Sequence, residues 1–72
     1  MSITEVSILS GEILLALERG GGKLPAEALA DSRSCSRDLL LMALGCLYKE
    51  GLIVLRPGIG GWMVQAASGS RA

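Results

Sequence analysis

Hydrophobic residues recur near the start of the chain with the spacing of one helix face. They follow one another at steps of three, four, one and three positions: Val6, Leu9, Ile13, Leu14 and Leu17. This period predicts an amphipathic helix over residues 4–19, because side chains at such spacings share one side of a helix. Thr4 is its predicted N-cap, and the triplet of glycines at residues 20–22 is predicted to end it.

Two more helices are predicted further along the chain. The first is short, with Pro25 at its first helical position and an end near Asp31. The polar segment SRSCS, residues 32–36, is typical of a turn. Ser36 is the predicted N-cap of a longer helix that runs to Glu50 and stops at Gly51.

The hydrophobic period changes after Gly51. The segments LIVLR, residues 52–56, and WMVQ, residues 62–65, are rich in residues that favour strands. The segment PGIGG between them, residues 57–61, predicts a hairpin turn, because proline and glycine suit turn conformations. Residues 66–72 offer little to bury, and a disordered tail is predicted there.

This order of elements predicts an α+β fold, a winged helix-turn-helix of three helices and a two-stranded β-hairpin wing in residues 1–65. One further pattern supports it. The spacing between the third helix and the wing is that of many winged helices, and the residues that carry it are Ala43, Leu44, Leu47, Gly51 and Ile53.

The chain also resembles a family of small stand-alone winged-helix proteins from bacteria and archaea. That family carries the signature ALGWLxREGKI in its third helix, and the corresponding segment here is ALGCLYKEGLI, residues 43–53. Cys46 stands where the family tends to have Trp, and Gly11 precedes Ile13 and Leu14 as in its first helix. The resemblance covers roughly residues 8–65 and mostly core positions. It implies the fold, and it implies no activity.

The predicted third helix is apolar on two sides. One side matches the core positions of a winged helix, with Leu40, Ala43, Leu44 and Leu47. The other side, which would face the major groove in a DNA reader, carries Leu39, Leu41, Met42, Gly45 and Cys46. Such a surface favours contact with a protein, most simply in a homodimer. The alternative is that the first helix or the N-terminal segment covers it within one molecule.

A DNA-binding transcriptional regulator is the other function that the pattern allows. The cations available for phosphate contacts are few and scattered: Lys23, Arg33, Arg37, Lys49 and Arg56. Seven basic and seven acidic residues give a formal net charge of zero, whereas nucleic-acid modules usually carry a basic excess or a basic face. Asp38 at the start of the third helix would also repel phosphate. The apolar residues of this helix therefore favour protein contact over DNA.

Enzymatic and metal-binding functions find little support in the residues. The chain has no histidine and two cysteines, so it cannot supply the four ligands of a structural zinc site by itself. Ser32, Ser34 and Ser36 have no base to activate them, and no cofactor or small-molecule substrate is indicated. Cys35 and Cys46 are interpreted as a turn residue and a packing residue rather than as a redox pair. Trp62 is expected to pack against the third helix rather than to stack on a base.

The apolar segments are also too short for a membrane span. No run approaches the roughly 18 residues that a span requires, and no signal-peptide pattern opens the chain. We therefore expect a cytoplasmic protein with reduced thiols and no membrane contact.

Overall fold

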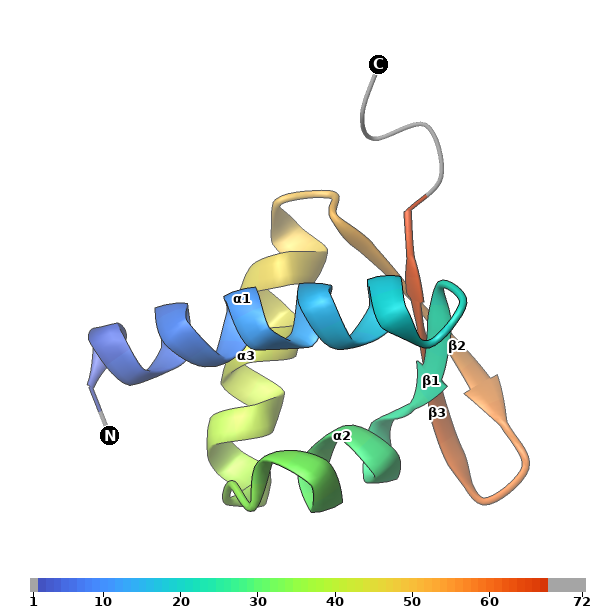
Figure 1. Ribbon diagram of the computed structural model, residues 1–72, viewed down its shortest axis with the longest axis horizontal. Coiled ribbons are helices and arrows are strands. Elements are labelled where there is room, and N and C mark those ends of the chain that lie inside the picture. The colour runs from blue at the N-terminus through green and yellow to red at the C-terminus, as the bar shows by residue number, and fades with distance from the viewer. Residues whose placement is uncertain (1, 68–72) are drawn as a thin grey trace.

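The computed structural model describes residues 2–67 and has an α+β fold. Its elements are α1 (Ile3–Arg19), β1 (Lys23–Pro25), α2 (Ala26–Arg33), α3 (Arg37–Lys49), β2 (Ile53–Gly58) and β3 (Gly61–Ala66). The three strands form one antiparallel sheet in the order β1-β3-β2. In Figure 1, α1 lies across α3, α2 lies below α1 beside the lower end of α3, and the sheet stands at one end of α1.

The N-terminus of α1 differs from the sequence prediction at its cap. Ser2 is the N-cap, and its Oγ accepts a hydrogen bond of 3.2 Å from the backbone N–H of Glu5. The backbone N–H of Ser2 donates in return to Oε1 of Glu5 at 2.7 Å. Two backbone donors are satisfied by this reciprocal pair, so the prediction of Thr4 as the cap was wrong.

The boundaries of α2 and α3 lie close to the predicted ones. Pro25 precedes α2 as its N-cap residue, rather than occupying the first helical position. Ser34 then reverses the chain with a left-handed backbone, at φ 52°. Ser36 caps α3 as predicted, because its Oγ accepts a 3.1 Å hydrogen bond from the backbone N–H of Leu39. Gly51 follows the helix at φ 77°, a conformation that favours glycine.

The sheet contains a strand that the sequence did not predict. β1 pairs with β3, with Leu24 opposite Val64, and it forms one edge of the sheet. Only three residues make up β1, and two of them, Lys23 and Pro25, are poor strand formers. Its pairing partner lies about forty positions away, so no local period could reveal it.

The hairpin between β2 and β3 is tighter than predicted. Pro57 and Gly58 belong to β2, and Gly58 pairs with Gly61, which leaves Ile59 and Gly60 as a two-residue turn. Pro57 fits in β2 because this strand is an edge of the sheet, where a missing N–H is tolerated. At the other end, Ala66 still belongs to β3, so the predicted tail begins too early. Residues 68–72 of that tail lie outside the described part of the chain.

One aliphatic core joins all three helices and two of the strands. Among the described residues, no polar or charged side chain is buried. The buried set is made of Leu, Ile, Val and Ala alone: Val6, Leu9, Ile13, Leu17, Leu29, Leu40, Ala43, Leu44, Leu47, Ile53 and Val64. The predicted inward positions of α1 and α3 are confirmed, except that Leu14 is only partly buried.

Candidate interaction surface on helix α3

Helix α3 has a buried side and an exposed apolar side. Leu40, Ala43, Leu44 and Leu47 are buried in the core. On the opposite side, Leu41 is 56% exposed and Met42 is 51% exposed. We call the exposed residues of this side the α3 outer face, and they are Leu41, Met42, Gly45 and Cys46.

Leu39 does not belong to the α3 outer face, although the sequence grouped it there. Its side chain is partly buried and packs against the core cluster. On a helical wheel Leu39 lies only about 20° from Cys46, so the elements packed around it, and not its angle, account for its burial. The side of the helix that the fold covers is therefore wider than the four predicted core positions.

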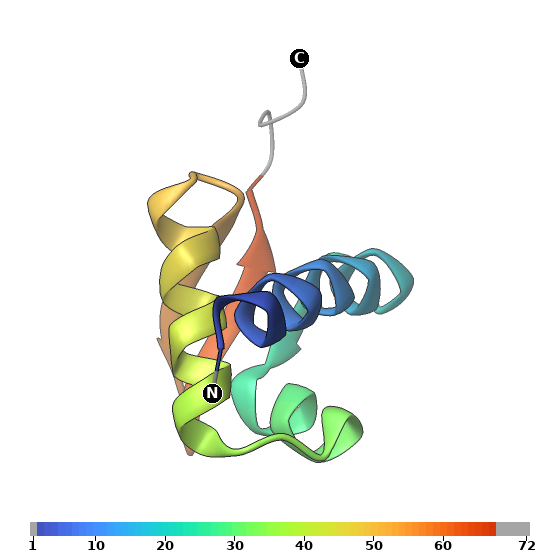
Figure 2. The same cartoon turned by 90° about the vertical axis from the view of Figure 1, so that its left-hand side faces the viewer.

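Helix α1 packs on the other side of α3 and leaves the α3 outer face uncovered. In Figure 2, α3 stands along the left margin of the molecule, and α1 lies on its right. Val6 and Leu9 of α1 are buried in the core together with Leu40 and Ala43 of α3. Within residues 2–67, no helix or strand lies over Leu41 or Met42 closely enough to bury them.

Gly45 forms a gap in the middle of the α3 outer face. A Cβ atom added there would meet no heavy atom within 4 Å. The fold therefore does not require glycine at this position for space, and Gly45 also lacks the positive φ that favours glycine. Glycine in a helix interior costs roughly 0.5–1 kcal/mol relative to alanine. The internal packing of residues 2–67 offers no compensation for that cost.

A groove runs between the α3 outer face and α1. Met42 and Cys46 line one wall, and Ile3, Ser10 and Leu14 are among the residues of the other. The groove encloses about 540 Å³ and is lined mainly by apolar atoms. Ile3 is 83% exposed at its mouth, so the apolar surface continues from α3 onto the first turn of α1.

A second groove runs between the α3 outer face and the β2–β3 hairpin. Leu41 and Gly45 line it on the helix, and Leu55, Ile59 and Trp62 line it on the hairpin. It encloses about 380 Å³. Trp62 lies across this groove from α3, but it remains 56% exposed and so is only partly packed. Apolar walls thus flank α3 on both sides.

Sequence reasoning missed the hairpin and N-terminal residues that extend this surface. Ile59 at the hairpin turn is fully exposed, and Ile3 is nearly so. A hydrophobic residue inside a Gly-rich turn, as in PGIGG, was the only local signal for Ile59. For Ile3 the signal was weaker, because it is one of several apolar residues of α1 that lie off the buried side of the helix, as Ile8 and Leu15 also do.

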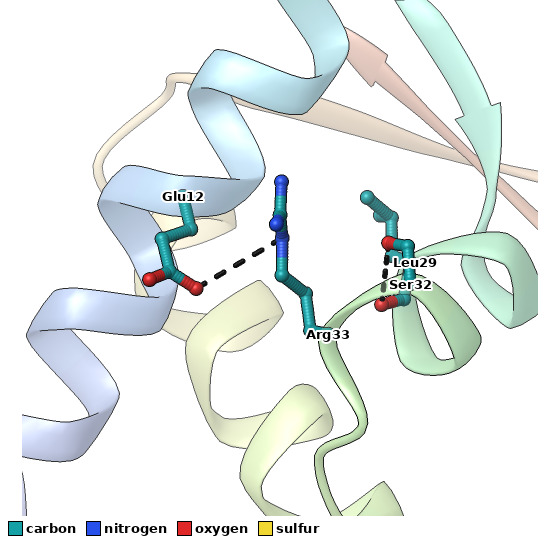
Figure 3. Close-up of polar contacts among 4 residues, drawn as sticks. All are labelled: Glu12, Leu29, Ser32 and Arg33. Atoms are coloured by element: carbon teal, nitrogen blue, oxygen red, sulfur yellow. Dashed lines mark hydrogen bonds and ion pairs between the residues drawn. The ribbon is translucent and has the colours of Figure 1, made fainter.

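Arg33 is turned toward α1 rather than toward the α3 outer face. Its Nε lies 3.9 Å from Oε1 of Glu12, and Figure 3 shows the two side chains reaching toward each other between α2 and α1. This distance is an ion-pair contact and is too long for a hydrogen bond, so the buried Nε keeps no hydrogen-bond partner. Beside it in Figure 3, the Ser32 hydroxyl donates to the carbonyl of Leu29 at 3.3 Å.

The other four cations predicted for phosphate contacts are not gathered into one patch. Arg37 and Lys49 are the first and last residues of α3, on opposite ends of the helix. Lys23 and Arg56 lie on the two edge strands of the sheet, and Nε of Arg56 donates to Oε1 of Gln65 at 3.2 Å. The pairing of the strands places Lys23 and Arg56 on the face of the sheet opposite to Val64, away from the core.

Two charges stand at the ends of the α3 outer face. Asp38 lies in the first turn of α3 and Lys49 in the last, and both are exposed. Within residues 2–67, neither takes part in an ion pair. The outer side of the helix therefore has an acidic end, an apolar middle with a gap at Gly45, and a basic end.

The cysteines and acidic residues of the described chain do not assemble a metal site. Both thiols are free, with Cys35 half-buried and Cys46 exposed on the α3 outer face. Among residues 2–67, no group of three or more Cys, Asp or Glu side chains could hold a metal ion. The helices of the same region are all too short or too polar to cross a membrane.

Comparisons of the chain with protein-family models, with curated proteins and with solved structures give no match.

Proposed function

We propose that this chain is a winged-helix domain that acts by binding rather than by catalysis, and that it self-associates through the α3 outer face. In this proposal α2 and α3 form the helix-turn-helix, and the β2–β3 hairpin is the wing. The position that reads DNA in many winged helices serves here as a protein contact. The placement of the protein in the cytoplasm belongs to the same proposal, and the two free thiols agree with it.

The observation that carries the proposal is the exposure of large apolar side chains on the α3 outer face. Leu41 and Met42 are both more than half exposed, next to Cys46 and the gap at Gly45. The flanking grooves add Ile3, Ile59 and Trp62 to the same region of apolar surface. Contiguous apolar surface on a small protein marks contact sites more often than it is left in water.

Solution mass tests the proposal directly. We expect the protein to sediment as a dimer, and Leu41→Glu or Met42→Glu to convert it to a monomer with an unchanged circular dichroism spectrum. A buried carboxylate without a partner is strongly unfavourable in an apolar contact, which is the reason for this choice. Ile8→Glu is the matched control, because Ile8 is 58% exposed on α1, outside the α3 outer face, and should leave the dimer intact.

A monomeric wild type at high protein concentration would rule the proposal out. The same holds if Leu41→Glu and Ile8→Glu reduced the mass to the same extent, since the contact would then not be specific to α3.

DNA binding is the second candidate function. Arg37 and Lys49 favour it, because both extend from the ends of α3 and neither has an ion-pair partner within residues 2–67. Against it stand the apolar α3 outer face, Asp38, and the engagement of Arg33 with Glu12. A phosphate-driven complex would weaken steeply with salt and with Arg37→Ala combined with Lys49→Ala. Titrations on random duplex DNA at low salt that show no binding would exclude it.

A further inference from the structure

We propose that the partner on the α3 outer face is a second copy of this chain whose α3 runs antiparallel to the first. The two-fold axis passes beside the helix between Ala43 and Leu44, so that Asp38 faces the partner's Lys49 and Lys49 faces the partner's Asp38. This inference rests on the proposed self-association and adds the orientation and register of the contact.

The placement of the two charges fits a two-fold pair. Asp38 and Lys49 are eleven positions apart, which is close to three full turns, so they lie on nearly one line along the helix. They are equally distant from the point between Ala43 and Leu44. A two-fold axis at that point therefore brings each charge opposite its counterpart in the other molecule.

The distribution of apolar residues between those charges fits the same pair. Leu41 and Gly45 line the groove beside the hairpin, and Met42 and Cys46 line the groove beside α1. A two-fold axis perpendicular to the plane of the two helices places the hairpin flank of one α3 beside the hairpin flank of the other, and the α1 flank beside the α1 flank. Leu41 then lies within about 1.5 Å, along the axis, of the partner's Gly45, and Met42 lies equally close to the partner's Cys46. The open space at Gly45 receives the partner's leucine side chain.

The charges also select one orientation over the other. In a parallel pair, Asp38 would stand beside the partner's Asp38, and Lys49 beside the partner's Lys49. Both contacts would be repulsive, whereas the antiparallel pair has two attractive ones and opposes the two helix dipoles.

The charges have a second explanation that a test must separate from this one. An acidic residue in the first turn and a basic residue in the last turn stabilise the helix through its dipole, without any partner. Reversal of both charges in one chain would worsen the dipole interactions but restore the contacts between antiparallel copies. The two explanations therefore predict opposite results for the double variant.

Disulfide trapping reports the orientation. In a background with Cys35→Ser and Cys46→Ser, we expect the double variant Asp38→Cys with Lys49→Cys to form a covalent dimer on mild oxidation. The two positions are about 16.5 Å apart on one helix, so they cannot join within a chain. Asp38→Cys alone and Lys49→Cys alone are the controls, and neither should cross-link, since identical positions are equally far apart in the antiparallel pair.

Charge reversal reports the contacts. We expect Asp38→Lys and Lys49→Asp each to raise the dimer dissociation constant by about tenfold, and the double variant to return it to within about threefold of wild type. Circular dichroism of each variant checks the fold, and both substituted positions lie on exposed helix surface.

The outcomes separate this inference from the proposed function. Efficient cross-linking of the single-cysteine variants would indicate a parallel pair and overturn the inference. So would a dimer that Leu41→Glu dissociates but that neither charge reversal nor the double-cysteine variant affects, and in that case the proposed self-association would stand. A wild-type protein that stays monomeric at all concentrations would overturn both.

Discussion

Nε of Arg33, at the end of α2, lies 3.9 Å from Oε1 of Glu12, in the middle of α1. Two helices that flank the core are thus connected at the surface by one ion pair. The Arg33 side chain is 29% exposed and that of Glu12 is 47% exposed, so solvent screens their attraction. This contact removes Arg33 from the set of cations that point freely into solvent.

Replacement of Glu12 by Gln should therefore change stability only slightly. We expect the free energy of unfolding to fall by less than about 1 kcal/mol at low salt, because partly exposed ion pairs contribute no more than that. At high salt the difference should shrink toward zero. Urea denaturation of both proteins at two salt concentrations measures it, and a loss that grows with salt would contradict the ion-pair account.

The cap of α1 can be tested by alanine substitution at two neighbouring positions. Ser2→Ala should lower the free energy of unfolding by about 1 kcal/mol, because it removes the hydrogen bond to the N–H of Glu5. Thr4→Ala is the matched control, since Thr4 lies inside the first turn and should have little effect. Thermal unfolding followed by circular dichroism would compare them, and an equal loss for both would argue against Ser2 as the cap.

Glycine-to-alanine substitution distinguishes the two glycines that lie inside helices. Gly45→Ala and Gly11→Ala both add a methyl group to open space within one molecule. Each should raise the stability of the isolated subunit by roughly 0.5–1 kcal/mol. Gly45→Ala alone should weaken self-association, because its methyl group occupies the gap that the partner would enter.

Unfolding measured over a range of protein concentrations resolves these two effects, since dimer stability depends on concentration. If Gly11→Ala weakened the dimer as much as Gly45→Ala, the gap on α3 would have no special role.

The largest change in the free energy of unfolding that we predict comes from a substitution in the core. Ile13 is fully buried, and Ile13→Ala should lower the free energy of unfolding by about 2–5 kcal/mol through lost burial and the cavity left behind. Ile8→Ala, at a position of the same helix that is 58% exposed, should cost less than about 1 kcal/mol. Chemical denaturation gives both values, and similar losses at the two sites would contradict the burial described here.

The hydrophobic period was sufficient to predict the three helices and the hairpin, because each of these depends on nearby residues. It was not sufficient for β1, whose pairing of Leu24 with Val64 depends on a distant strand. The N-cap was misassigned to Thr4, although Ser2 followed by Glu5 three positions later is a capping-box pattern that the sequence displays.

Part of the candidate surface was predictable, because the positions of residues around one helix depend only on local geometry. Helical geometry alone placed Leu41, Met42, Gly45 and Cys46 on one side of α3, and the structure leaves all four exposed. Leu39 was misplaced because its burial depends on where the neighbouring elements end, which a helical wheel does not contain. The walls formed by Ile3, Ile59 and Trp62 arise only when α1 and the hairpin are brought beside α3.

The order of the sheet has a consequence for how the chain folds during its synthesis. β3 is the central strand, and where it ends the chain is bonded to both edges of the sheet, through Ala66 N–H to the carbonyl of Gly22 at 2.8 Å and Ala67 N–H to the carbonyl of Leu52 at 3.0 Å. A ribosome makes β3 after both of its neighbours, so β1 and β2 have no pairing partner until the final residues of the sheet emerge. Until Val64 emerges, the part of the apolar core that β3 covers stays open to water. The domain is therefore expected to complete its fold only after β3 has emerged, and its long-range strand pairs favour slow folding.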